Sequence, residues 1–173
     1  MLYDTLINQL SADELVAVLG HELGHFKLKH ILKGLLKSIP LVFAGLFLLF
    51  LFSKNESLYQ GFGFDISLTN ENVKWIQFAG VTLLLLVWKS VSEILTPIGN
   101  ISSRKHEYEA DRFSADVCGT SDDLISGLVK LNSENLSELF PPDIYVWWNY
   151  SHPTLVQRVK ALKVYEKKAV KSK

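Results

Sequence analysis

Two uncharged, strongly apolar runs are the feature of this sequence that most limits its fold. They cover residues 39–52 and 75–88, and each is 14 residues long. A helix needs about 20 apolar residues to cross a bilayer. The first run extends back to residue 31, where lysines can reach the membrane surface, and the second continues to residue 98. We therefore predict two transmembrane helices, over residues 31–52 and 73–98; the alternative is a pair of buried core helices in a soluble protein.

Charge placement predicts how these two helices are oriented. The basic residues on the outer flanks of the two runs are Lys27, Lys29, Lys33 and Lys37 before the first and Arg104 and Lys105 after the second. The connecting loop, residues 53–72, contains Lys54 as its only basic residue. The positive-inside rule then places this loop on the lumenal side and both flanks in the cytosol. The two runs form a hairpin that returns the chain to the side it left.

The rest of the chain reads as helix, so the predicted fold class is all-α, an integral-membrane helical bundle with a cytosol-facing helical core. Ser11 and Glu14 form a capping box that starts a helix over residues 11–38. A further helix covers residues 100–118 and ends before Gly119, and C-terminal helices fill residues 121–173. One cysteine excludes an internal disulfide, and zero net charge gives no case for nucleic-acid binding.

The segment HELGH at residues 21–25 carries the first chemical signal. His21 and His25 are four residues apart, so on a helix they lie on one face and can bind one zinc ion. Glu22 lies beside that face and can take a proton from a water bound there. His30 falls roughly opposite His21 on a continuous helix, so we exclude it as a ligand. The competing interpretation is two surface histidines beside a solvated glutamate.

A catalytic zinc ion needs a third protein ligand, and the segment around Glu107 is the best source. Glu107 and Asp111 are four apart and share a helix face. One of the two carboxylates can bind zinc while the other accepts the free N–H of a ligand histidine. We expect Glu109 to be solvated, and His106 is a weaker rival ligand. The predicted hairpin brings this helix to the membrane side that carries HELGH.

Three ordered segments, VAVLGHELGHFKLKH, SRKHEYEADRFSADVCG and YSHPTLVQRVKAL, resemble the CAAX prenyl protease type 1 family of integral-membrane zinc endopeptidases. The resemblance implies that His21, His25 and Glu107 bind one zinc ion per chain. It further implies that Glu22 is the catalytic base and that Asp111 orients a ligand. By the same resemblance His152 reaches the active site and can steady an oxyanion. Arg158 is implied to lie near the catalytic site, where it can pair with Asp111 or meet a substrate carboxylate.

The resemblance also implies a substrate class and a cellular location. Family members remove the aaX tripeptide from prenylated CAAX proteins in the endoplasmic reticulum membrane, so we expect contacts with membrane lipid and a zinc site toward the cytosol. The family has additional spanning helices before HExxH, and this sequence begins about twenty residues before that motif. We therefore expect residues 1–173 to be the C-terminal catalytic part of a longer peptidase, which works with N-terminal helices of the same protein.

Two other functions stay open at this point. One is an HExxH membrane protease of protein quality control, which cuts unfolded membrane proteins. The other, of a different class, is a zinc-stabilised membrane scaffold without turnover. The presence of Glu22 argues against the scaffold.

Overall fold

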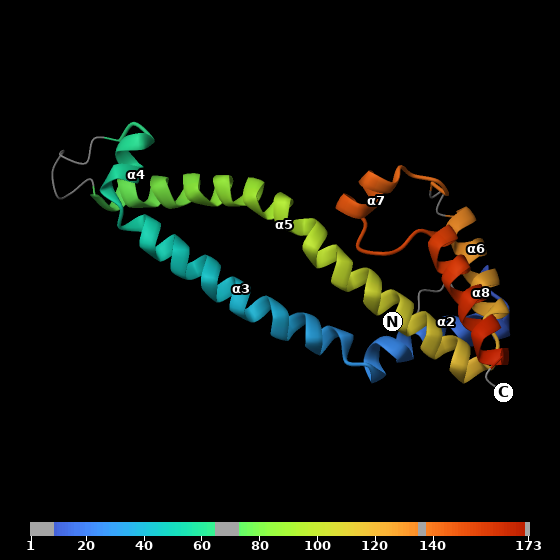
Figure 1. Ribbon diagram of the computed structural model, residues 1–173. Helices are drawn as coiled ribbons and strands as arrows, with labels where there is room; N and C mark the ends of the chain where they lie inside the picture. Colours follow the sequence, from blue (N-terminus) through green and yellow to red (C-terminus); the bar gives the residue numbers. More distant parts are fainter. Residues whose placement is uncertain (1–8, 65–72, 135–137, 172–173) are drawn as a thin grey trace. The chain divides into compact units, whose positions relative to one another are not determined.

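A computed structural model describes residues 9–64, 73–134 and 138–171 (Figure 1). Every regular element within these residues is a helix, which confirms the all-α prediction. The helices are α2 (Ala12–Lys27), α3 (His30–Ser53), α4 (Glu56–Gly61), α5 (Val73–Cys118), α6 (Asp122–Glu134), α7 (Asp143–Asn149) and α8 (Leu155–Lys171). They fall into two compact units, one of Met1–Ile31 with Thr96–Lys173 and the other of Leu32–Leu95.

The second unit contains the apolar helices. Two stretches are long and apolar enough to cross a membrane, His30–Ser53 and Gly80–Cys118. In the most apolar 18-residue window of the first, 0% of the residues are buried by protein, and in that of the second 6%. A core helix of a soluble protein would be mostly buried, so this exposure favours transmembrane helices over that alternative. A 39-residue stretch is about 60 Å long, roughly twice the hydrocarbon core of a bilayer. It can therefore continue beyond the membrane.

The connection within this unit holds a short helix where we predicted only a loop. The side chain of Asn55 caps α4, accepting a hydrogen bond from the Leu58 N–H. Tyr59 is 3% exposed and its hydroxyl donates to the Ser53 carbonyl at 2.8 Å. Its ring occupies the space that a side chain on Gly80 would need, so α4 packs directly on α5. Residues 65–72 of the predicted loop lie outside the described residues.

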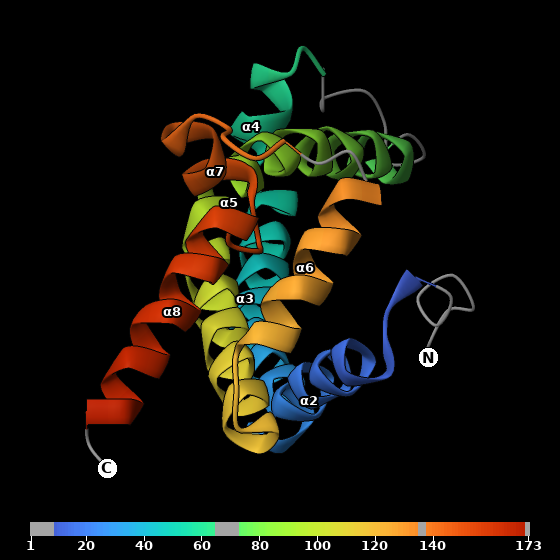
Figure 2. The same ribbon diagram turned by 90° about the vertical axis from the view of Figure 1, so that its right-hand side faces the viewer.

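The capping box that starts α2 is present as predicted. The Ser11 hydroxyl accepts from the Glu14 N–H, and Glu14 accepts from the Ser11 N–H at 2.8 Å. Glu14 also accepts from the Ser126 hydroxyl at 2.6 Å and from Lys130 Nζ at 2.7 Å, both on α6. These bonds lower the pKa of Glu14 to about 2, with Lys130 the largest cause. One buried carboxylate thus caps α2 and attaches it to α6, which packs against both α2 and α8 (Figure 2).

The long helices differ from their predicted bounds. We expected one helix over residues 11–38, but α2 ends at Lys27 and α3 begins at His30. Between them Lys29 has φ 57°, a left-handed conformation that a continuing helix cannot contain. Conversely, the segments expected at 73–98 and 100–118 form the single helix α5, with Pro97 inside it. Proline removes one helical hydrogen bond, and here the helix continues past it until Gly119, which has φ 76°.

Small residues let α2 and α5 approach closely in the first unit. Added Cβ atoms would come within 3.0 Å of Ser114 Oγ at Gly20 and 3.1 Å of Ala110 Cα at Gly24. The Ser114 hydroxyl donates to the Ala17 carbonyl at 2.6 Å, which ties the two helices together. A small apolar core of Ala17, Ala115, Leu124 and Leu162 lies beside this contact. The approach places the residues next to the glycines, including His21 and His25, directly against α5.

Candidate metal centre

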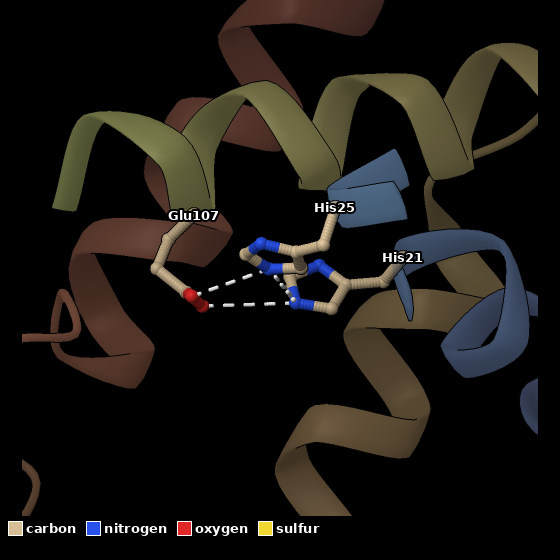
Figure 3. Close-up of side chains that lie close together, drawn as sticks. All are labelled: His21, His25 and Glu107. Atoms are coloured by element: carbon tan, nitrogen blue, oxygen red, sulfur yellow. Dashed lines mark hydrogen bonds and ion pairs between the residues drawn. The ribbon is translucent and has the colours of Figure 1, made fainter. Parts of the chain in front are cut away.

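His21 and His25 of α2 face Glu107 of α5, and their three side chains converge (Figure 3). The Nε2 atoms of the two histidines are 3.1 Å apart. Glu107 Oε2 lies 3.7 Å from His21 Nε2, and Glu107 Oε1 lies 3.3 Å from His25 Nε2. Glu107 is 4% exposed and His21 8%, so the group is largely shielded from solvent. Burial, followed by the neighbouring His21, lowers the pKa of His25.

This geometry fits a metal ion. Four-coordinate zinc holds nitrogen and oxygen ligands at about 2.0–2.2 Å, which puts tetrahedral ligand atoms about 3.4 Å apart. The three separations of 3.1, 3.3 and 3.7 Å scatter around that value. Two imidazoles and one carboxylate leave a fourth position open, as catalytic sites do. The three residues can therefore hold one metal ion.

Asp111 lies one turn beyond Glu107 on α5 and supports His21 from behind. Its Oδ1 lies 2.9 Å from His21 Nδ1. Arg158 of α8 donates to the same carboxylate twice, from Nε to Oδ2 at 2.9 Å and from Nη2 to Oδ1 at 2.5 Å. Burial alone would lower the pKa of Arg158, but the hydrogen bonds and charge of Asp111 raise it. Asp111 thus contacts both Arg158 and His21, and it can fix the His21 ring with Nε2 toward the metal position.

His152 reaches the centre from the segment before α8. Its Nδ1 lies 3.1 Å from Glu107 Oε2, and this hydrogen bond raises the pKa of His152. Its side chain is 66% exposed. The ring also lines an open cavity of about 360 Å³ together with Asn132, Tyr150 and Thr154. His152 therefore lies both beside the metal position and on the wall of an open cavity.

Glu22 follows His21 on α2, and its side chain is exposed. It is absent from the converging group of His21, His25 and Glu107. A base that takes a proton from water and returns it to a leaving group must remain accessible to both. Its exposure beside the ligand face suits that role.

His30 does not lie where the sequence predicted. The left-handed Lys29 redirects the chain, so His30 leaves the helical register and lies against His25, with the two Nδ1 atoms 3.1 Å apart. Its Nε2 lies 3.1 Å from Glu109 Oε2, so the expectation that Glu109 is solvated was wrong. The His106 ring stacks on His30 at 4.2 Å and is not among the converging ligands.

Comparison with known proteins assigns the chain to a family. The model of Peptidase family M48 matches residues 1–166. The chain belongs to peptidase family M48. It is 36% identical over 158 residues to "CAAX prenyl protease 1 homolog" of Dictyostelium discoideum, covering 91% of this chain and 35% of the relative. It is 35% identical over 154 residues to the protein of the same name from Homo sapiens, covering 87% and 30%.

A solved structure gives the same result for this M48 chain. The crystal structure of S. mikatae Ste24p superposes with a TM-score of 0.78 and 32% sequence identity, covering 93% of this chain and 38% of the other. The family resemblance predicted from the three sequence segments is therefore confirmed. The chain spans about a third of the length of the relatives it matches.

The M48 chain also contains supporting residues that sequence reasoning did not single out. Arg104 Nη1 donates to the Tyr150 carbonyl at 2.6 Å, and Asn100 Nδ2 donates to the Trp148 carbonyl at 2.7 Å. Both carbonyls lie at the C-terminal end of α7, where unpaired carbonyls and the helix dipole favour such donors. These bonds fix the segment that leads to His152. The sequence did show that Arg104 is a basic residue close to Glu107, but we interpreted its charge only as an indicator of membrane topology.

Proposed function

We propose that this chain is the catalytic part of a membrane zinc endopeptidase that removes the C-terminal aaX tripeptide from prenylated CAAX proteins. The observation that carries the proposal is the convergence of His21, His25 and Glu107, with Glu22 on the same helix, in a member of a peptidase family. Relatives named CAAX prenyl proteases supply the substrate class.

The proposed mechanism divides the work among the side chains. Zinc, when bound by His21, His25 and Glu107, supplies a Lewis acid that polarises a carbonyl and acidifies water. Glu22 takes the proton of the attacking water and delivers it to the leaving amine. His152, whose Nδ1 lies 3.1 Å from Glu107, can donate a hydrogen bond to the developing oxyanion. The Asp111–Arg158 pair holds His21 in register.

The apolar helices support a lipid-modified substrate. Side chains of α3 such as Phe43, Phe47 and Phe50 are 69%, 60% and 51% exposed. Burying a prenyl chain is worth about 0.8 kcal/mol per CH₂ group, so an enzyme beside or within the bilayer can gather its substrate there. We further propose an endoplasmic reticulum location with the centre toward the cytosol, on the charge asymmetry around the two apolar runs. Participation of N-terminal helices of the same protein stays a prediction.

One substrate comparison tests the function. The purified protein receives a farnesylated CAAX peptide and its unprenylated twin, each with and without a zinc chelator. We expect cleavage of the farnesylated peptide only, at the bond after the modified cysteine, abolished by chelation and restored by zinc. Equal cleavage of both peptides would favour the quality-control protease. Metal binding without cleavage of any membrane or soluble substrate would favour the scaffold.

A further inference from the structure

His30 is a buried polar side chain for which the proposed mechanism has no role. It is the first residue of α3 and is 4% exposed. Its two ring nitrogens have different partners: Nδ1 lies 3.1 Å from His25 Nδ1, and Nε2 lies 3.1 Å from Glu109 Oε2. His30 thus connects the rear of a candidate ligand to a carboxylate on α5.

The hydrogens of this chain of contacts have one consistent arrangement. His25 Nε2 faces Glu107 and His21, so a neutral His25 that binds metal there carries its hydrogen on Nδ1. That N–H donates to His30 Nδ1. A neutral His30 then carries its hydrogen on Nε2 and donates it to Glu109. Each N–H in this arrangement donates to one acceptor, and the last acceptor is the carboxylate of Glu109.

The surroundings hold His30 in this position. The left-handed Lys29 directs the chain back toward α5. On α5, the His106 ring stacks on His30 with an interplanar angle of 6°, which covers one of its faces. Lys105 Nζ lies 3.8 Å from the second oxygen of Glu109, so Oε1 faces a cation while Oε2 faces the imidazole. His106 and Glu109, which both contact His30, are three residues apart and so lie on one face of α5.

We propose that His30 is a positioning residue: with Glu109 it orients the His25 ring toward the metal, as Asp111 does directly for His21. The inference rests on the proposed zinc centre. Outer carboxylates that orient ligand histidines commonly contribute 10- to 100-fold to metal affinity. The centre then has two outer supports. Asp111 contacts His21 directly, whereas Glu109 acts on His25 through the imidazole of His30.

Zinc affinity tests the inference without recourse to activity. The full protein, purified in detergent, is titrated with zinc against a chromophoric chelator, and its cobalt form is examined by visible absorption. His30→Leu removes both hydrogen bonds and should weaken zinc binding about 10- to 100-fold and shift the cobalt bands. His30→Gln offers a carbonyl to His25 and an amide N–H₂ to Glu109, so it should recover most of the affinity and the wild-type bands.

A double-mutant cycle separates positioning from general destabilisation. Glu109→Leu should weaken zinc binding by itself yet add little to His30→Leu, because both changes break one chain of bonds. Leu124→Ala, which destabilises the core without touching the centre, is the matched control and should leave zinc affinity within about twofold. Wild-type affinity in His30→Leu, or no recovery in His30→Gln, would overturn the inference and leave the zinc centre standing. A wild-type protein that binds no zinc would overturn both.

Discussion

Gly24 of α2 lies against Ala110 of α5 with no room for a side chain between them. A Cβ on Gly24 would be 3.1 Å from Ala110 Cα and 3.2 Å from its carbonyl oxygen, so the two helix backbones would have to separate slightly to admit it. This contact sets the separation between the helix that carries the two histidines and the helix that carries Glu107. We expect Gly24→Ala to destabilise the protein by about 1–3 kcal/mol and to weaken zinc binding, measured by denaturant unfolding and zinc titration.

Gly99 on α5 gives the matched control, because an added Cβ there meets nothing within 4 Å. Gly99→Ala should be neutral or stabilise by up to about 1 kcal/mol through helix propensity. Its zinc affinity should equal that of the wild type. If the two alanine variants behaved alike, close packing at Gly24 would not be what positions the histidines.

Removing the proposed base should separate binding from chemistry. Glu22 is exposed and lies outside the three converging ligands, so Glu22→Gln should keep one zinc per chain. We expect its kcat to fall about 10²- to 10⁴-fold, because the glutamine cannot accept the proton of the attacking water. Metal analysis and peptide cleavage measure the two properties on one sample. A variant that keeps its turnover would remove Glu22 from the mechanism.

Asp111 should matter for both stability and metal affinity. It is 1% exposed and pairs with Arg158 and His21. Asp111→Asn removes the nearer carboxylate of the Arg158 guanidinium and leaves Glu107 at 3.8 Å. Breaking a buried pair costs up to about 3–5 kcal/mol, and the change should weaken zinc binding about 10- to 100-fold. Asp116→Asn, at an exposed position on the same helix, should change stability by about 0.5 kcal/mol or less. Similar losses in both variants would mean that the Asp111 contacts contribute nothing specific.

We expect the attachment of α2 to α6 through Glu14 to weaken at acidic pH. Its pKa falls from 4.5 to about 2 through the bonds from Lys130, Ser126 and Ser11. A lowered carboxyl pKa contributes stability that is complete above pH 4.5 and is lost as the pH falls toward 2. Glu14→Gln should therefore be less stable than the wild type above pH 4.5, and the difference should shrink on acidification. Unfolding midpoints over that range measure it, and a constant difference would contradict the assignment.

Replacing Lys29 by glycine should stabilise the protein, whereas the same replacement at an ordinary helix residue destabilises it. Its φ of 57° costs a side-chain-bearing residue about 1 kcal/mol, so Lys29→Gly should stabilise the protein by a similar amount. Lys33→Gly, in the interior of α3, should destabilise by about 1 kcal/mol. Thermal or denaturant unfolding of both variants decides the matter, and a loss of stability in Lys29→Gly would contradict the observed turn.

Much of this architecture could be predicted because its signals are local. Ser11 and Glu14 alone specify the start of α2, and the four-residue spacings of His21 with His25 and of Glu107 with Asp111 specify two shared helix faces. The apolar runs indicated membrane helices from length and composition. The candidate site residues that the sequence predicted on α2, α5 and α8 lie close together in the structure, around the group of His21, His25 and Glu107.

The remainder depended on contacts that no local pattern carries. The continuous helix predicted over residues 11–38 fails at Lys29, because lysine gives no sign of a left-handed conformation as glycine would. That one residue changed the position of His30 and, with it, the partner of Glu109. The boundary placed between the segments 73–98 and 100–118 was also absent: α5 continues past Pro97, whose side chain is fully buried.

The bond between Asp111 and Arg158 has a consequence for the timing of biosynthesis. A ribosome making this chain delivers the two imidazoles before the guanidinium, which follows the first of them by 137 positions. Until α8 emerges and folds, Arg158 cannot pair with the Asp111 carboxylate behind His21, and the proposed metal centre lacks one of its supports. A chain stalled or clipped ahead of this helix would keep the HELGH motif but lack the ion pair that supports His21.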